Sequence, residues 1–235
     1  MKNYRIADLS VNMEVGGRTL YQSEKYKVSD TPDDMADITV ANLSESINLI
    51  LKKHPQAVWD TVEYLLSGLR FYKALVDFDG FMLHSSAVVY EGKAYLFSAD
   101  SGVGKSTHTS LWLQRFPGSF ILNDDKPALR IINGTTYVYG TPWNGKGERN
   151  VNTCVPLGGI CFIYRAQQNT IRPMPTPQVI QNLLRQTAHG KFSEQIMTKL
   201  FLIWNQVLAD HKVYEMGCLP NIEAAELAYQ TMKGN

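Results

Sequence analysis

A glycine-rich loop between a short apolar strand and a helix constrains this chain more than any other feature of its sequence. The loop reads Ala99-Asp100-Ser101-Gly102-Val103-Gly104-Lys105-Ser106. It matches the phosphate-binding pattern G-x-x-x-x-G-K-[ST] except at its first position, where Ala99 replaces glycine. The apolar residues up to Ser98 predict a strand, and the residues from Lys105 to Arg115 predict a helix. This order of strand, loop and helix is the context that such a loop requires.

The residue types of the loop predict a site for ATP and Mg²⁺. Gly102 and Gly104 allow backbone N–H groups to face phosphate oxygens, and the helix N-terminus adds partial positive charge. Lys105 is suited to the β- and γ-phosphates, and the Ser106 hydroxyl is suited to Mg²⁺. The alternative interpretation is a glycine-rich turn that binds no ligand. The predicted nucleotide-binding residues are Asp100, Ser101, Gly102, Val103, Gly104, Lys105, Ser106 and Thr107.

An acid pair follows the loop by about one strand–helix unit, in Asn123-Asp124-Asp125. Adjacent carboxylates near a polyphosphate are costly unless a cation lies between them. One carboxylate is therefore expected to hold Mg²⁺, and the other to act as a base near the acceptor hydroxyl. The alternative is a turn with solvated acids.

His84 lies on a strand that a hairpin turn at Glu91-Gly92 connects to the strand feeding the loop. By alternation, Met82, His84 and Ser86 are expected to share one strand face. The sequence leaves two interpretations of this histidine open. It either contacts phosphate or a second metal, or it is a hydrogen-bonded structural residue.

Together these motifs resemble the HPr kinase / ATP-dependent phosphoenolpyruvate carboxykinase superfamily of P-loop kinases. Leu83-His84-Ser85-Ser86-Ala87, the glycine loop and the acid pair occur in that family's order over residues 80–130. The resemblance implies an α/β, carboxykinase-like P-loop fold with a mixed sheet flanked by helices. It also implies that Asp124 is the base, that Asp125 is a metal ligand, and that His84 is the metal- or phosphate-site histidine.

Differences between this sequence and the family's larger members limit the resemblance to a smaller group of related proteins. The chain is too short for a carboxykinase and lacks the glycine-rich signature that HPr kinase/phosphorylases carry after the acid pair. Gly140-Thr141-Pro142-Trp143-Asn144-Gly145-Lys146 and Pro156-Leu157-Gly158 look like a set of small HPr-kinase-related proteins. Because that set is linked to phosphorylation of free serine or peptides, the resemblance implies a hydroxyl-bearing acceptor: a peptide, a protein or free serine.

The segment 140–156 is rich in glycine, asparagine and proline, and it is long for a turn. Loops of that length are usually functional or disordered. It is expected to close over the acceptor, with Lys146 or Arg149 stabilising charge on the transferring phosphoryl group. The alternative is a solvated surface loop.

The rest of the chain predicts how the fold is organised. Short strands are expected at 4–9, 11–15 and 38–40, with a polar turn at 29–34 before the third. Helices are expected at 44–53, with Ser44 as its cap, at 55–75 and at about 176–187. Strands combined with both hairpins and crossovers favour an α/β class with a mixed sheet. We divide the chain into a small β-rich and helical N-terminal extension, 1–78, and a kinase-like core, 79–235. The apolar stripe of the second helix is predicted to lie in the core: Val58, Val62, Leu65, Leu66, Leu69 and Tyr72.

Composition excludes other classes of protein. With 23 Lys and Arg against 22 Asp and Glu, the chain lacks the basic footprint of a nucleic-acid binder. Its three cysteines show no metal spacing and are expected to be small apolar residues rather than nucleophiles. No signal peptide or membrane span is evident, so we expect a cytoplasmic protein without a membrane partner. The sequence leaves open whether the protein forms homo-oligomers.

Isolated histidines and helical aromatic residues are given ordinary structural positions. The histidines without a second ligand at metal spacing are expected at the surface or at caps: His54, His108, His189 and His211. The aromatic residues in helical patterns are expected in the core: Trp112, Phe201, Trp204 and Tyr229.

The sequence therefore predicts an ATP- and Mg²⁺-dependent kinase that phosphorylates a hydroxyl, with Asp124, His84, Lys105 and Arg149 taking part in catalysis. A first alternative is a non-catalytic regulatory module that binds nucleotide and positions the 140–156 segment for a partner. A second is a site that only hydrolyses phosphate or reverses the transfer.

Overall fold

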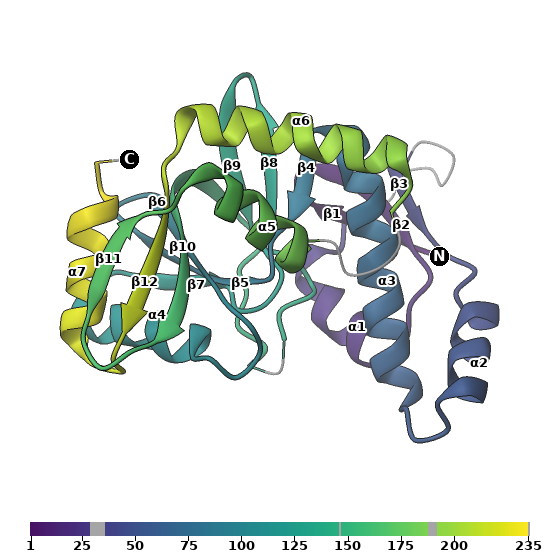
Figure 1. Ribbon diagram of the computed structural model, residues 1–235. Coiled ribbons are helices and arrows are strands. Elements are labelled where there is room, and N and C mark those ends of the chain that lie inside the picture. The colour runs from purple at the N-terminus through teal and green to yellow at the C-terminus, as the bar shows by residue number, and fades with distance from the viewer. Residues whose placement is uncertain (29–35, 146, 188–191, 235) are drawn as a thin grey trace.

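The computed structural model describes residues 1–28, 36–145, 147–187 and 192–234. Over these residues the chain is a mixed α/β fold, a curled mixed sheet with helices packed on it (Figure 1). The turn expected at 29–34, Lys146 and His189 lie outside the described residues.

The larger sheet has nine strands within the described residues, in the order β4-β8-β9-β10-β6-β5-β7, with β12 on β10 and β11 on β12. Its long strand β10 changes partners along its length. Residues 154–156 pair antiparallel with β9, and later residues pair parallel with β6 and β12. The pairing with β6 shifts register at Gly158, where an added Cβ would lie 2.9 Å from the Tyr95 ring. The bounds are β4 Gly80–Met82, β5 Ser85–Tyr90, β6 Lys93–Ser98, β7 Phe120–Asn123, β8 Ala128–Ile132, β9 Thr135–Tyr139, β10 Cys154–Arg165, β11 Thr170–Pro173 and β12 Val213–Cys218.

The smaller sheet is built from the N-terminal residues. β1 (Lys2–Ile6) pairs antiparallel with β2 (Leu9–Met13), which pairs parallel with β3 (Ile38–Val40). The first strand is shorter than the predicted 4–9 because Ala7 and Asp8 have φ of 52° and 59° and form the hairpin turn.

The helices agree with the predicted pattern in several places. The second helix of the structure and the helix over 176–187 have the predicted bounds, but Leu43 rather than Ser44 occupies the cap position. A short helix after Gly16 was not predicted. The helical bounds are α1 Gly17–Ser23, α2 Ser44–Lys53, α3 Trp59–Leu75, α4 Lys105–Arg115, α5 Thr176–Thr187, α6 Glu194–Asp210 and α7 Ile222–Met232, with short 3₁₀ turns η1 Glu24–Tyr26 and η3 Val76–Phe78.

The prediction for the apolar stripe of α3 is partly wrong. Val62 and Tyr72 are buried, but Val58 is 64% and Leu65 is 52% exposed. The buried face of α3 instead includes Glu63, on the side that packs against α1, and Gly68, which packs against Trp143. Leu65 therefore lies largely outside the core that the apolar pattern suggested, and Leu66 and Leu69 are only partly buried.

Both faces of the large sheet are covered. Alternate residues of β6 enter different cores: Leu96 packs with α5 and α6, and Phe97 packs with α4 and α7. Figure 1 shows α7 and α4 together at one end and the N-terminal elements at the other. A third core joins the small sheet and α3 to Met82, Ala128, Tyr139 and Trp143 of the rest of the chain. No finding tests the division at residue 78, which stays a prediction.

Two assignments of individual side chains are corrected. His108, expected at the surface, is only 2% exposed because it packs on the Phe97 ring and accepts a hydrogen bond from Trp112 Nε1. Phe201, expected in the core, is 42% exposed on α6. Within the described ranges, no helix is both long enough and apolar enough to span a bilayer.

Candidate functional site

The glycine loop turns sharply between β6 and α4. Gly102 has φ of 81° and Gly104 has φ of 131°, values that side-chain-bearing residues rarely adopt. An added Cβ would meet nothing within 4 Å at either position, so the backbone conformation alone requires glycine. Ala99, the departure from the loop pattern, is buried and lies outside the left-handed region. The substitution therefore carries no backbone strain.

Lys105, the first residue of α4, folds back over the loop. Its Nζ donates to the Ala99 carbonyl at 2.9 Å and to the Asp100 carbonyl at 3.5 Å, and the residue is 8% exposed. Burial lowers the pKa of Lys105, and the nearby carboxylates of Asp125, Asp100 and Asp124 oppose that shift. The ammonium group thus lies where loop carbonyls and acids converge.

Asp124 follows β7 and is buried against α4. Its Oδ1 accepts a hydrogen bond from Ser86 Oγ at 2.6 Å, and its Oδ2 pairs with Arg149 at 2.7 Å. Ser86 Oγ is also 2.8 Å from Thr109 Oγ1 on α4. These contacts fix the carboxylate between the sheet and the helix that the loop begins.

Asp125 has a different set of partners. Its Oδ1 lies 3.2 Å from His84 Nε2, and its Oδ2 lies 2.5 Å from Lys126 Nζ. Burial raises the pKa of Asp125, but the hydrogen bond from His84 and the charge of Lys126 outweigh it and lower the pKa to about 2. This carboxylate is therefore ionised at neutral pH.

His84 joins the acid pair to the loop through α5. It lies in a break between β4 and β5, so it does not share a strand face with Met82 and Ser86 as expected. Its Nδ1 is 3.0 Å from Gln186 Oε1, and Gln186 Nε2 donates to Asp100 at 3.0 Å. The His84 ring therefore connects Asp125 to Gln186, and Gln186 connects this pair to Asp100 of the loop.

These groups line one cavity of about 330 Å³, called here the loop cavity. It brings together most of the residues predicted for the site, although Asp100, Val103 and Arg149 do not line it. Asp100 pairs with Arg185 and Gln186, and Arg149 reaches the site only through Asp124. The lining consists of His84, Ser101, Gly102, residues 104–107, both aspartates, Gly145 and Gly147.

The donors in the loop cavity suit a hard cation that is only partly held by protein. Within the part of the chain that is described, no three His, Cys, Asp or Glu side chains are grouped to hold a metal. The cavity does offer the Ser106 hydroxyl and two carboxylates. Mg²⁺ usually keeps waters and takes one or two protein ligands beside phosphate oxygens, so this donor set fits Mg²⁺ bound with a nucleotide.

The 140–156 segment is packed over residues 140–145, whereas residues 147, 148 and 151–153 are exposed. Trp143 is fully buried, stacks on Phe71 with ring centroids 5.0 Å apart, and donates to Ser67 Oγ at 3.1 Å. The segment ends earlier than predicted, because β10 begins at Cys154 and includes Pro156.

Residues that the sequence did not single out hold this segment at the site. Tyr64 OH accepts from the Gly145 amide at 3.0 Å, and Arg18 donates to the Gly145 carbonyl while lying over the Tyr64 ring. Gln186 likewise had no sequence signal, being one glutamine in an amphipathic helix. Their positions depend on contacts between segments far apart in the chain, as between Arg18 and Gly145.

Comparisons with known proteins give limited similarity. No family model matches this chain, and no curated protein matches it. Among solved structures, it is similar to the Hpr(Ser) kinase/phosphatase from Coxiella burnetii, at 11% identity and a TM-score of 0.37. The likeness covers 64% of this chain and 93% of that chain.

Proposed function

We propose that this protein is an ATP- and Mg²⁺-dependent phosphotransferase that transfers the γ-phosphoryl group to a hydroxyl acceptor, the serine of a peptide or protein or free serine. One observation carries the proposal. The glycine loop, Lys105, Ser106 and the two aspartates, which are separate in sequence, line a single cavity at the start of α4. A triphosphate needs amide donors, a cationic side chain and acids for its metal in such an arrangement.

The loop residues would bind the nucleotide. Residues 101, 102 and 104–106 line the cavity, and their backbone amides together with the N-terminus of α4 would suit the β- and γ-phosphates. Lys105 Nζ would exchange its bonds to loop carbonyls for phosphate oxygens. A second cavity of about 430 Å³, beside Arg165 and Pro220 on the other side of the loop, offers space for the nucleoside.

The two aspartates would have different roles in binding the metal and in catalysis. Mg²⁺, when bound with the nucleotide, neutralises phosphate charge, and Ser106 and Asp125 are the residues proposed to hold it. Asp124 is proposed to accept the proton of the acceptor's hydroxyl group. The acceptor's oxygen bonds to the γ-phosphorus as the bond between that phosphorus and the ADP oxygen breaks. Arg149, at 2.7 Å from Asp124, would move toward the transferring group.

The test is transfer from γ-labelled ATP to serine and to serine peptides. Lys105→Ala should abolish transfer and weaken nucleotide binding, because the cavity loses the only lysine among its described lining residues. Lys233→Ala, an exposed lysine at the end of α7, is the matched control and should behave as wild type. Full transfer by Lys105→Ala would refute the proposal.

One observation favours the non-catalytic alternative, a module that binds nucleotide without turnover. Both oxygens of Asp124 are already bonded, one to Ser86 and the other to Arg149. A base held in this way must release a partner before it takes a proton. Such a module would gain thermal stability with Mg·ATP and transfer no label to any acceptor.

A further inference from the structure

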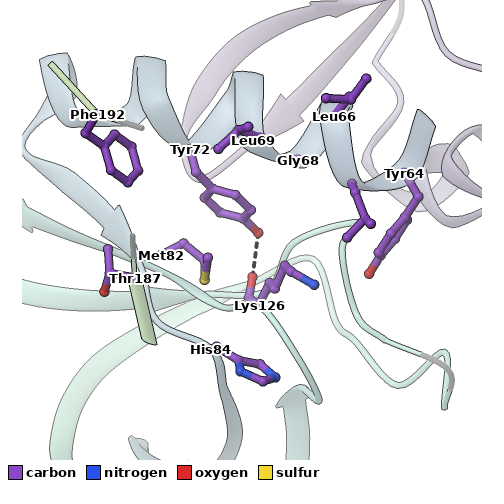
Figure 2. A pocket seen from close by; sticks show the side chains of 11 residues that line it. Tyr64, Leu66, Gly68, Leu69, Tyr72, Met82, His84, Lys126, Thr187 and Phe192 are labelled. Atoms are coloured by element: carbon purple, nitrogen blue, oxygen red, sulfur yellow. Dashed lines mark hydrogen bonds between the residues drawn. The ribbon is translucent and has the colours of Figure 1, made fainter. Parts of the chain in front are cut away.

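An apolar cleft of about 430 Å³ lies between α3 and the segment that carries His84 (Figure 2). Leu65, Leu66 and Leu69 of α3 line one side, and Met82 and Phe192 line the others. These are the leucines that the sequence predicted to be core. The structure leaves Leu65 about half exposed and leaves Leu66 and Leu69 only partly buried.

Most polar side-chain atoms in the cleft are already bonded to protein, although the buried Thr187 Oγ1 has no hydrogen-bond partner among the described residues. Tyr72 OH donates to the Lys126 carbonyl at 2.6 Å, as the dashed line in Figure 2 shows. Lys126 Nζ pairs with Asp125 at 2.5 Å and lies 5.3 Å from the centre of the Tyr64 ring. The cleft wall therefore offers mainly apolar surface.

The cleft and the loop cavity share His84 as a lining residue. Figure 2 places His84 at the opposite side of the cleft from the α3 leucines. The Asp125 carboxylate, which lines the loop cavity, contacts both His84 and Lys126 of the cleft. A molecule seated in the cleft is thus held beside the point where the phosphoryl group would be delivered.

We propose that this cleft binds a bulky apolar side chain that flanks the acceptor hydroxyl in a peptide segment, an inference that rests on the proposed phosphotransferase function. A free amino acid fits poorly, because none of the residues lining the cleft carries a carboxylate to pair with an α-ammonium group. The volume exceeds what a serine side chain fills, and the leucines add nothing to a small polar acceptor. The acceptor class is therefore a serine- or threonine-containing peptide with a neighbouring leucine or aromatic residue.

The experiment compares two peptides, Gly-Leu-Ser-Leu-Gly and Gly-Ala-Ser-Ala-Gly, with free serine as a third acceptor. Wild type should phosphorylate the leucine peptide with a kcat/KM about 10- to 100-fold higher, the range expected for filling an apolar pocket. Leu65→Asp and Leu69→Ala should remove that preference while leaving the rate with the alanine peptide unchanged. Leu202→Asp, the same change at a more exposed leucine on α6, is the control and should retain the preference.

A binding measurement separates failure of this inference from failure of the proposed function. Fluorescein-labelled versions of both peptides are titrated with the full chain and each variant, with and without Mg·ATP. Leucine-selective binding that Leu65→Asp weakens supports the cleft even when no transfer occurs. Equal binding and equal transfer of both peptides overturns the cleft. Concentration-dependent self-association that Leu65→Asp abolishes also overturns it, because the occupant is then a second copy.

Discussion

Asp124 and Asp125 are neighbours in the chain, yet they lie in different surroundings. Asp124 is bonded to Ser86 and Arg149 on the side of α4. Asp125 faces His84 and Lys126, where the loop cavity and the apolar cleft meet. We propose Asp124 as the base and Asp125 as a metal ligand, whereas an acceptor entering from the cleft would first meet Asp125. Substitution of each residue separates these two divisions of labour.

Replacing the base and replacing the metal ligand should affect different quantities. If Asp124 is the base, Asp124→Asn should lower kcat by about 10²–10⁴-fold and leave Mg·ATP affinity nearly intact. Asp125→Asn should raise the Mg²⁺ concentration needed for half-maximal transfer and weaken Mg·ATP binding. Kinetics with varied Mg²⁺ and calorimetric titration measure both, with exposed Asp210→Asn as control. If Asp125→Asn lowers kcat and Asp124→Asn weakens Mg·ATP binding instead, the two roles are exchanged. An unchanged kcat in Asp124→Asn would exclude Asp124 as the base.

At the scale of elements, α1 is joined to α3 by one buried carboxylate. Glu63 on α3 is 1% exposed. Its Oε1 accepts from the Gly16 amide at 2.6 Å, and its Oε2 accepts from Thr19 Oγ1 at 2.7 Å. Glu63 thus satisfies an amide at the start of α1, a role that a local cap residue usually fills. Arg18 of the same helix, which donates to the Gly145 carbonyl, depends on this anchor for its position.

The free energy of unfolding should depend on pH through the ionisation of Glu63. Burial raises its pKa, Thr19 and Gly16 partly oppose the shift, and Asp60 adds to it. Because the folded state then holds a proton more tightly than the unfolded state, the free energy of unfolding falls as pH rises from the ordinary value of 4.5 through the raised pKa. Glu63→Gln should lack that fall, and exposed Glu45→Gln should retain it, as urea unfolding at several pH values measures. Parallel pH curves for wild type and Glu63→Gln would contradict this.

The elements that the sequence predicted well are those with local signals. α2 and α5 have the predicted bounds because their periodic patterns end at charged or polar residues, and Gly102 and Gly104 marked the loop by spacing alone. α1 and β11 were missed because each is short and is held by contacts with distant residues. The same reason explains why Gln186, Tyr64 and Arg18 were missed at the site. The prediction that the apolar stripe of α3 is buried was partly wrong because apolar residues on an exposed helix face repeat with the same spacing as those on a core face.

At the scale of the whole molecule, Trp143 connects the N-terminal elements to the site. It packs between Phe71 and Tyr72 of α3, and an added Cβ on Gly68 would lie 3.0 Å from its ring. Two residues farther on, Gly145 lines the loop cavity. From this packing we predict that residues 1–78 and 79–235, which the sequence divides, unfold as one cooperative unit.

Trp143→Ala should therefore destabilise the whole chain, by about 3–5 kcal/mol as for other large buried aromatic residues. Unfolding should remain one transition, with the fluorescence and far-ultraviolet circular dichroism curves coinciding, because the core around Trp143 contains side chains from both predicted parts. Trp59→Ala, at an exposed tryptophan of α3, should cost far less, and Trp143→Phe should recover part of the loss. Two separate transitions in Trp143→Ala would instead show that the parts fold independently. In that case the N-terminal elements could be lost without unfolding the sheet that carries Lys105 and the acid pair.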